Sequence, residues 1–248
     1  MSTINFVHLD KKIYDTKELH PQPMRKFAPE WYKNIPNNVR LTGFDKSFHK
    51  HFDSLNHIST IKTCPSFVDV FQEGYVLLAP QDYLFKYEPD TDTHHHYTSS
   101  SFNNGTELQV NTHSNTQMVD YLPQASNILF VFKIILPINI ITNKGYSTRM
   151  MPMPYDFNED WHCNYGVFKT DLIHQLNIQI NITSGNKEIL IKQGEPLCVL
   201  IPYKRETYNS NNILLEDNKK IQKIFNRFNA LFEGKLNKKY YRNKWHKK

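Results

Sequence analysis

The sequence predicts an all-β protein with minor α-helix, built as an antiparallel β-sandwich or small barrel, and three observations lead to this fold class. In residues 176–182, Leu and Ile alternate strictly with Asn and Gln, which is the period of a strand with one face on a core. A turn containing Gly then precedes the short apolar run 189–191, and a second such turn separates this run from the run 197–201. Residues 128–135 form a nearly continuous apolar run, typical of a strand buried on both faces.

Four segments follow one another along the chain. Residues 1–57 are polar and broken by Pro, which predicts an irregular N-terminal segment that wraps the domain. Residues 58–208 hold the strand patterns and form the predicted sandwich or barrel domain. Residues 209–234 predict a C-terminal amphipathic helix, and residues 235–248 form a basic tail.

Within the β domain the elements alternate with turns. A short helical turn is expected at 67–71 and a polar, loop-rich stretch at 88–127. The predicted strands are 74–78 and 83–87, paired as a hairpin, then 107–110, 128–135, 146–153, 176–182, 189–191 and 197–201. In the helix, apolar residues recur at spacings of three and four, and we expect Ile221, Ile224, Phe225 and Phe228 of this stripe to face the sheet. The stripe consists of Ile213, Ile221, Ile224, Phe225, Phe228, Leu231 and Phe232.

Composition indicates a folded cytoplasmic protein. Hydrophobic residues make up 39% of the chain, and its longest apolar run is interrupted by Lys133, Pro137 and Asn139, so no membrane span and no membrane partner are expected. No secretory signal is visible at the N-terminus. Three widely spaced cysteines without a CxxC pair indicate reduced thiols. The abundance of Asn, Ile and Lys suggests an AT-rich genome and a phage or bacterial origin, hence a host cytoplasm for a phage protein.

The positive charge is concentrated in the tail. Residues 235–248 carry seven Lys and Arg and no acid, and subtracting these seven from the net charge of +6 leaves −1 for the rest. Basic residues interleaved with aromatic ones can bind phosphates and stack on bases. The tail therefore offers a candidate nucleic-acid site at Lys238, Lys239, Arg242, Lys244 and Trp245. A solvated end whose aromatic residues dock on the body is the favoured alternative.

A His-rich stretch is the candidate metal site. His94 and His96, on one face if the segment is a strand, are spaced as in a cupin-type barrel, where iron or another divalent metal is held with a carboxylate and a later His. The nearest following carboxylate is Glu107, and the later imidazoles are His113, His162 and His174. Because residues 89–93 read as a loop, a solvated His-rich loop is favoured over a metal site.

Two further pairs are candidate binding or reactive groups. His113 and Gln117 can hydrogen-bond a polar ligand at a sandwich mouth, or satisfy buried backbone groups, and the structural role is favoured. His162 and Cys163 are adjacent, but neighbours on an extended chain point apart, which disfavours a nucleophile. Phosphate-cradling and dinucleotide-binding glycine motifs are missing from the sequence.

The order of several short motifs resembles an uncharacterised family of bacterial and phage proteins of about 250 residues. The resemblance covers roughly residues 25–245 and implies no known activity. It rests on the motifs 28–31, 61–65, Asp69, 74–75, His113, Gln117, 145–147, 166–167, 170–171, 194–197, 201–202, 205–206, 241–242 and Trp245. If these positions mark a shared site, it consists of His113, Gln117, Tyr146, Asp171 and Arg205.

The C-terminal part is also similar in outline to the β-clip barrel of dUTPases and dCTP deaminases. There a Gly-x-x-Asp turn precedes a strand, whereas here Asp171 lies five residues after Gly166. The Ser-Gly signature and the Gly-rich tail of that family are missing, which speaks against hydrolysis of a nucleoside triphosphate. A shared fold would not by itself imply a shared function.

Three functions remain at the level of sequence. The first is a non-enzymatic β-sandwich protein that binds a small polar ligand or acts as a structural or accessory component, including a jelly-roll viral protein. The second is a cupin-like metal-dependent oxygenase with a His-rich site. The third is a nucleic-acid accessory protein that uses the basic tail. The first is favoured because no catalytic signature is recognisable in the 248 residues.

Overall fold

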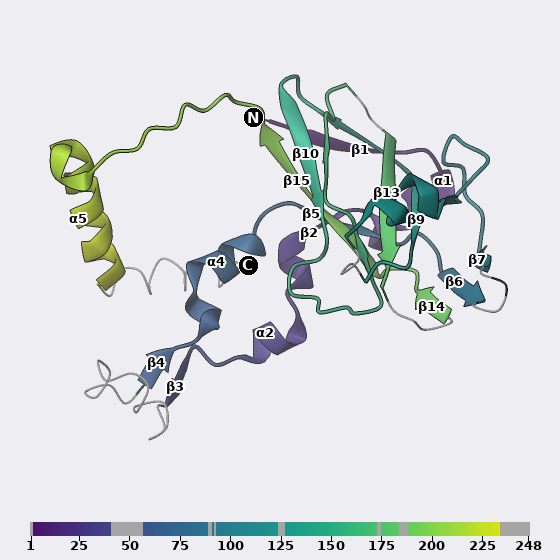
Figure 1. The fold of residues 1–248 in the computed structure, drawn as a ribbon, viewed down its shortest axis with the longest axis horizontal. Helices are drawn as coiled ribbons and strands as arrows, with labels where there is room; N and C mark the ends of the chain where they lie inside the picture. The colour runs from purple at the N-terminus through teal and green to yellow at the C-terminus, as the bar shows by residue number, and fades with distance from the viewer. Residues whose placement is uncertain are drawn as a thin grey trace. The chain divides into compact units, whose positions relative to one another are not determined.

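The structure is a computed structural model that describes residues 2–40, 57–88, 91, 93–123, 127–172, 175–183 and 188–233. It separates into two compact units, which we call the β unit (residues 1–27 and 73–205) and the second unit (28–72 and 206–248). The chain is mostly β, with 40% strand and 22% helix in antiparallel sheets and no closed barrel among the described residues. The predicted fold class is therefore confirmed in its open, sheet-on-sheet form (Figure 1).

Sheet A is built around the long strand β9. Its strands are β1 (Ile4–His8), β8 (Val110–His113), β9 (Phe130–Thr142), β13 (Gln175–Ile182) and β11 (Trp161–Cys163). One edge of β9 pairs with β13, and the other edge is shared by β1 and β8. Strand β11 extends the sheet beyond β13. Nearly every residue of β9 is buried, as its continuous apolar sequence predicts.

Sheet B faces sheet A across the core. Its strands, in spatial order, are β12 (Gly166–Phe168), β10 (Tyr146–Met151), β15 (Pro196–Lys204), β5 (Tyr75–Leu78) and β2 (Gln22–Pro23). Gly74 precedes β5 with φ of +80°, and a Cβ there would collide with the carbonyl of Leu200, so this position requires glycine. Gly145, with φ of +86°, makes the turn between β9 and β10.

A third, three-stranded sheet corrects two sequence-based predictions. It consists of β14 (Glu188–Ile191), β6 (Tyr83–Glu88) and β7 (Thr93–Thr98). The predicted hairpin between 74–78 and 83–87 is wrong, because β5 pairs in sheet B whereas β6 pairs with β7 and β14. The favoured His-rich loop is also wrong, because His94 to His96 lie in β7.

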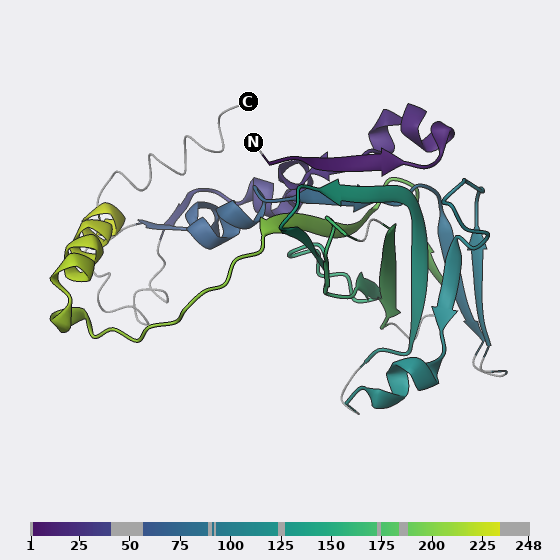
Figure 2. The ribbon, with the colours of Figure 1, turned by 90° about the horizontal axis from the view of Figure 1, so that it is seen from above.

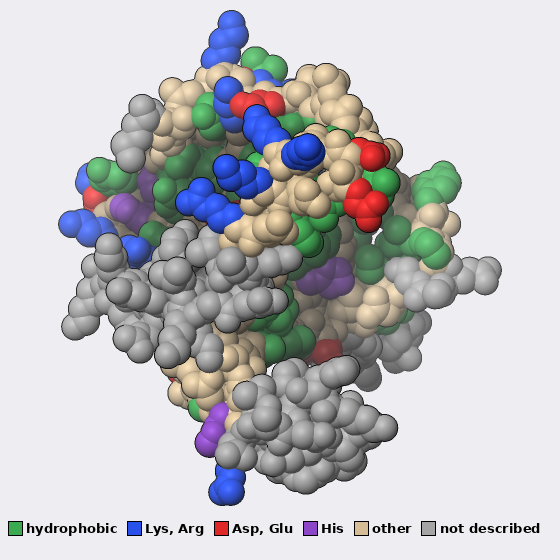
Figure 3. Space-filling model, turned by 90° about the vertical axis from the view of Figure 1, so that its left-hand side faces the viewer, with side chains coloured by type: hydrophobic (Ala, Val, Ile, Leu, Met, Phe, Trp, Pro, Cys, Tyr) green, Lys and Arg blue, Asp and Glu red, His purple; other side chains and the backbone are tan. Residues whose placement is uncertain are grey.

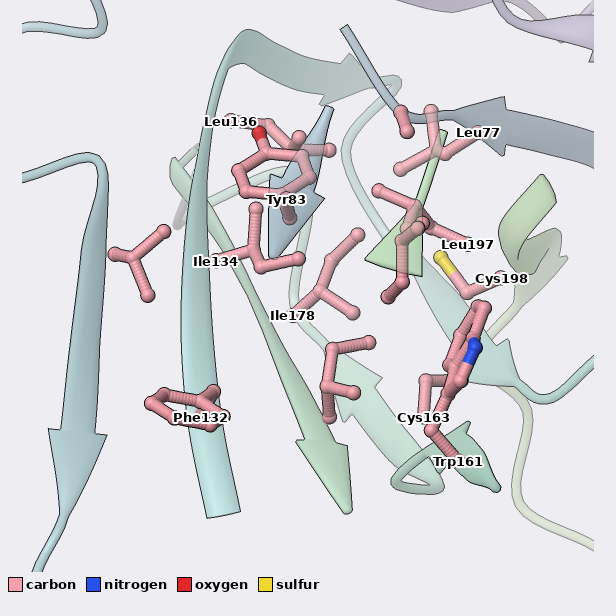
Figure 4. Close-up of a cluster of buried hydrophobic side chains, with 14 of the residues drawn as sticks. Leu77, Tyr83, Phe132, Ile134, Leu136, Trp161, Cys163, Ile178, Leu197 and Cys198 are labelled. Carbon is pink, nitrogen blue, oxygen red and sulfur yellow. The ribbon is translucent and has the colours of Figure 1, made fainter. Parts of the chain in front are cut away.

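One hydrophobic core joins the three sheets. Sheet A contributes Phe132, Ile178 and Ile180, sheet B contributes Cys198, and the small sheet contributes Phe85, all at most 1% exposed. The rings of Phe85 and Phe132 stack with centroids 4.2 Å apart. Figure 4 shows side chains of the core cluster converging from strands on different sides. The inward side chains of β13 are therefore the Leu and Ile of its alternating sequence.

The N-terminal segment is less irregular than predicted. Strand β1 pairs with β9 over residues Ile4–His8, and Figure 2 shows it running along that strand. Helix α1 (Lys11–Asp15) follows and is capped by Asp10, whose carboxylate accepts a hydrogen bond from the backbone N–H of Ile13 at 3.0 Å. Part of residues 1–57 therefore belongs to the main sheet rather than wrapping around it.

The second unit has a small core of its own. Its elements are α2 (Glu30–Asn34), β3 (Asn38–Arg40), β4 (His57–Ser59), α4 (Pro65–Val70) and α5 (Lys219–Glu233). Tyr32 is fully buried and its ring lies 5.2 Å from that of Phe71. The ammonium of Lys62 donates to the Tyr32 carbonyl at 2.9 Å, and burial lowers the pKa of this lysine. Helix α5 is shorter than the predicted 209–234, and Ile224 and Phe225 of its apolar stripe are exposed, while the packing of this stripe on the sheet stays a prediction.

Candidate ligand-binding site

Three of the five residues predicted to bind a ligand meet at one end of sheet B. Arg205, just after β15, donates from Nη1 to Asp171 Oδ1 at 2.8 Å and from Nη2 to Asp171 Oδ2. The same Nη1 also donates to Ser147 Oγ at 3.0 Å and to the backbone carbonyl of Tyr146. Asp171 Oδ2 accepts a further bond from the Gly145 backbone N–H at 2.7 Å. We call this set the Asp171–Arg205 clamp.

The clamp is saturated by its own partners. The Asp171 side chain is only 3% exposed and both of its oxygens are paired. The hydrogen bond from the Arg205 guanidinium, helped by that from Gly145, holds the pKa of Asp171 down at about 2. The phenol of Tyr146 contacts Ser2 Oγ. The clamp therefore ties the start of β10 to the end of β15, and this geometry supports a structural role.

The other two predicted residues lie elsewhere. His113 ends β8 in sheet A. Gln117 lies in a 3-10 helix of one turn, Asn115–Gln117. Its Oε1 accepts a hydrogen bond from the Ser114 backbone N–H at 3.1 Å. The five predicted residues thus do not form one site, because Tyr146, Asp171 and Arg205 belong to sheet B and its turn.

The two candidate metal ligands pack on aromatic side chains. The ring of His94 lies 4.2 Å from that of Phe130, edge to face, and the ring of His96 lies 6.0 Å from that of Phe132. Burial, with the nearby His95, lowers the pKa of His96. In the described part of the chain, no three His, Cys, Asp or Glu side chains come together as a metal site. His174 and the candidate nucleic-acid residues Lys238, Lys239, Arg242, Lys244 and Trp245 lie outside the described residues.

The outer face of sheet A brings together polar side chains from four strands. The register aligns His162, Asn181, Val131 and His113 in one row across β11, β13, β9 and β8. The next row aligns Gln179, Lys133 and Asn111. Since alternate residues of a strand share a face, Asn177 and Asn139 lie on this face too. We call this surface the polar face; it consists of Asn111, His113, Lys133, Asn139, His162, Asn177, Gln179 and Asn181.

A chain of hydrogen bonds runs across the polar face. Gln179 Nε2 lies 3.4 Å from His113 Nε2, and Gln179 Oε1 accepts from Asn164 Nδ2 at 2.8 Å. Asn181 Nδ2 donates to Asn164 Oδ1 and lies 3.1 Å from His162 Nε2. Asn164 follows β11, so the connection after this edge strand closes the network.

The network leaves buried oxygens without partners. The Oδ1 atoms of Asn139, Asn177 and Asn181 are buried and accept no hydrogen bond within the described structure. Asn181 as a whole is 1% exposed. A buried acceptor left unpaired costs about 1–3 kcal/mol, so native proteins rarely keep several on one surface. Each of these oxygens would be stabilised by a hydrogen-bond donor such as a water molecule or a ligand group.

One positive charge lies among these amides. Lys133, directly opposite Gln179 in the register, is half-buried and has no ion-pair partner in the described residues. The strand positions that form the polar face include no Asp or Glu. Figure 3 shows another side of the molecule, on which Lys and Arg side chains lie next to several Asp and Glu side chains. A local excess of positive charge attracts anionic ligands.

A hollow of about 330 Å³ lies beside β11 and shares His162 with the polar face. Its rim carries Phe157 and Tyr165, which are 74% and 75% exposed. Tyr155 and Phe157 hold positive φ angles of 59° and 56°, which bulky residues rarely adopt. Such strained backbone is concentrated at functional sites.

Burial shifts the pKa values of two titratable side chains that line the hollow. Desolvation lowers the pKa of His162, so the imidazole stays neutral at neutral pH and can accept from Asn181. Desolvation around the carboxyl raises the pKa of Asp156, although that residue as a whole is exposed. The hollow therefore combines aromatic walls, a neutral imidazole and a carboxyl group.

The sequence patterns predict only part of this site. They point to His113 as a ligand-binding residue and to His162 as a later imidazole, whereas no motif points to Lys133, Gln179 or Asn181. The available signal was the choice of Asn and Gln for every polar position of 176–182, where a solvated strand face would more often carry charged residues or Thr. Neither a protein-family model nor a curated protein matches the chain.

Proposed function

We propose that the β unit is a non-enzymatic binding module that holds a small polar ligand on the polar face. The observation that carries this proposal is the set of buried oxygens of Asn139, Asn177 and Asn181, which have no partner within the described residues and lie on the same sheet face as Lys133. A polar surface kept half-buried without full pairing weakens the fold, and a ligand that completes the pairing offsets that cost. A structural or accessory role in a larger assembly stays a prediction.

The groups of the polar face define the ligand's chemistry. Unpaired amide oxygens require hydroxyl or N–H donors, whereas the Lys133 ammonium, unopposed by a carboxylate, favours a negative charge. The exposed rings of Phe157 and Tyr165 offer flat apolar surfaces at the rim of the hollow. A hydroxylated ring that carries one carboxylate, such as a sugar acid, meets all three requirements.

The test compares the binding of three sugars that differ mainly in charge. Calorimetric titration with glucuronate, glucose and glucosamine should give the tightest binding for glucuronate. Lys133→Met should remove that preference by about tenfold in Kd, since a charge-assisted hydrogen bond is worth about 1.5–3 kcal/mol. Lys192→Met, at an exposed lysine in the turn before β15, is the matched control and should leave the preference unchanged.

Three outcomes of the titration would each contradict one part of the proposal. Equal binding of glucuronate by the Lys133 and Lys192 variants would overturn the role of Lys133. Absence of binding for all three sugars, and for a panel of hydroxy and amino acids, would overturn the ligand class. Binding that survives Asn181→Leu would place the ligand away from the unpaired amides.

A further inference from the structure

Helix α5 of the second unit presents an apolar stripe to solvent. Ile224 and Phe225 are 60% and 47% exposed, and Ile221 is half-buried. On a helix these three positions lie within one narrow arc. The sequence continues the same spacing at Phe228, Leu231 and Phe232.

The opposite face of α5 is basic. Lys219, Lys220, Lys223 and Arg227 are all exposed, and no ion pair holds any of them within the described residues. At 100° per residue, Lys220 and Arg227 fall beside the apolar arc and Lys219 and Lys223 fall behind it. The only acid of the helix is its last residue, Glu233.

The apolar and basic faces of α5 together indicate which kind of surface the helix can bind. No helix within the described residues is long and apolar enough to cross a membrane. A helix with an apolar stripe, a basic polar face and low overall hydrophobicity instead lies in the plane of a membrane interface, with its stripe among the acyl chains. Its lysines then lie at the level of anionic headgroups.

We propose that α5 docks the protein onto an anionic lipid surface. The proposal is independent of the ligand bound by the β unit and revises the expectation that the protein has no membrane partner. The segments before and after the helix also carry residues that favour binding to a membrane surface. Tyr208 and Leu214, before the helix, are 82% and 64% exposed. Residues 235–248, after it, add seven basic residues interleaved with Tyr240, Tyr241 and Trp245, and aromatic residues favour the headgroup region.

The apolar stripe separates this partner from a nucleic acid. Phosphate contacts need only the basic residues, so binding of DNA or RNA would not depend on Ile224 and Phe225. A membrane interface needs both faces, because the charges supply attraction and the stripe supplies insertion. The dependence on the stripe is therefore the decisive measurement.

The experiment is sedimentation of the full-length protein with vesicles. Vesicles of phosphatidylcholine with about 30% phosphatidylserine are compared with pure phosphatidylcholine. The double variant Ile224→Ser/Phe225→Ser keeps every charge and removes the exposed stripe. The matched control, Val167→Ser/Leu172→Ser, removes two apolar side chains of the β unit that are 60% and 68% exposed. Circular dichroism melts verify that each variant is folded.

The expected result has three parts. The protein binds anionic vesicles at least about tenfold more strongly than neutral ones, and raising salt from about 50 mM to about 500 mM releases it. The stripe variant loses at least about tenfold in vesicle partitioning, while the control variant behaves as the parent. In a separate Phe225→Trp variant, the additional tryptophan emission shifts to the blue on anionic vesicles.

Three results would overturn the proposal. One is equal sedimentation of the stripe variant and its parent. Another is salt-sensitive binding to a DNA or RNA oligonucleotide, unchanged in the stripe variant, without vesicle binding, which would assign the basic residues to nucleic acid. The third is a dimer of the parent that the stripe variant abolishes, again without vesicle binding, which would assign the stripe to a second copy of the chain.

Discussion

Two of the places where the β unit buries polar groups differ in how completely those groups are paired. In the Asp171–Arg205 clamp, both carboxylate oxygens meet donors from Arg205 and Gly145. On the polar face of sheet A, Asn139, Asn177 and Asn181 each keep a buried oxygen without a partner. The clamp therefore serves the fold, whereas we propose that a ligand completes the pairing of the polar face.

These two places show that the residue type alone does not identify a binding site. Asp and Arg are frequent binding residues, yet in this protein they satisfy each other and hold strand ends. Asn and Gln on a strand look like ordinary polar positions, yet their pairing is incomplete. Whether a buried polar group belongs to the fold or to a ligand depends on the partners it already has.

The largest effect on stability is expected from breaking the clamp. Asp171→Ala leaves the Arg205 guanidinium without its carboxylate and removes the acceptor of the Gly145 N–H. It should lower the thermal unfolding midpoint more than any substitution on the polar face. Fluorimetry or circular dichroism measures this. A midpoint equal to that of the parent would contradict the structural role of the clamp.

Acid should reveal the same clamp through its titration. The pKa of Asp171 lies at about 2 in the folded protein, below its ordinary value of 3.8. The unfolded state therefore binds more protons between these values, and the stability from Asp171 is present above pH 3.8 and lost as pH falls towards 2. Asp171→Asn should flatten this part of the curve in denaturant titrations at pH 2–5. An unchanged slope would show that the pair carries no such linkage.

A smaller stability effect, with a large binding effect, is expected on the polar face. Asn181→Leu removes a buried unpaired oxygen but also the donor of two hydrogen bonds. Because the gain and the loss oppose each other, we expect a change in unfolding free energy within about 1 kcal/mol, measured by chemical denaturation. Affinity for the polar ligand should nevertheless fall. A loss as large as that of Asp171→Ala would mean that the polar face, like the clamp, serves the fold.

The smallest effect is expected from His162. Burial lowers its pKa below the ordinary value of 6.5, so the unfolded state binds the proton more readily just below that pH. Its stability contribution is therefore present above pH 6.5 and lost as pH falls. His162→Gln should reduce this slope only in part, because burial lowers the pKa of His8 and His96 as well. A slope unchanged between pH 5 and 7 would contradict the shift at His162.

The local elements of this protein can be predicted from the sequence alone. The alternation in 176–182 was sufficient to predict β13, the continuous run at 128–135 predicted the first part of β9, and the Gly turns separated β14 and β15 from each other and from β13. The change of period near the C-terminus predicted helix α5. These signals are local, because burial of one face and the φ of a turn are written in neighbouring residues.

Which strands are neighbours in a sheet could not be predicted from these local patterns. The consecutive strands β13, β14 and β15 belong to three different sheets, and β5 and β6 do not form the expected hairpin. The polar face likewise combines residues from β8, β9, β11 and β13. Strand pairing is a long-range choice made by the packing of the whole core. Periodicity therefore indicates that a side chain faces outward, whereas its partners follow from the assembled sheets.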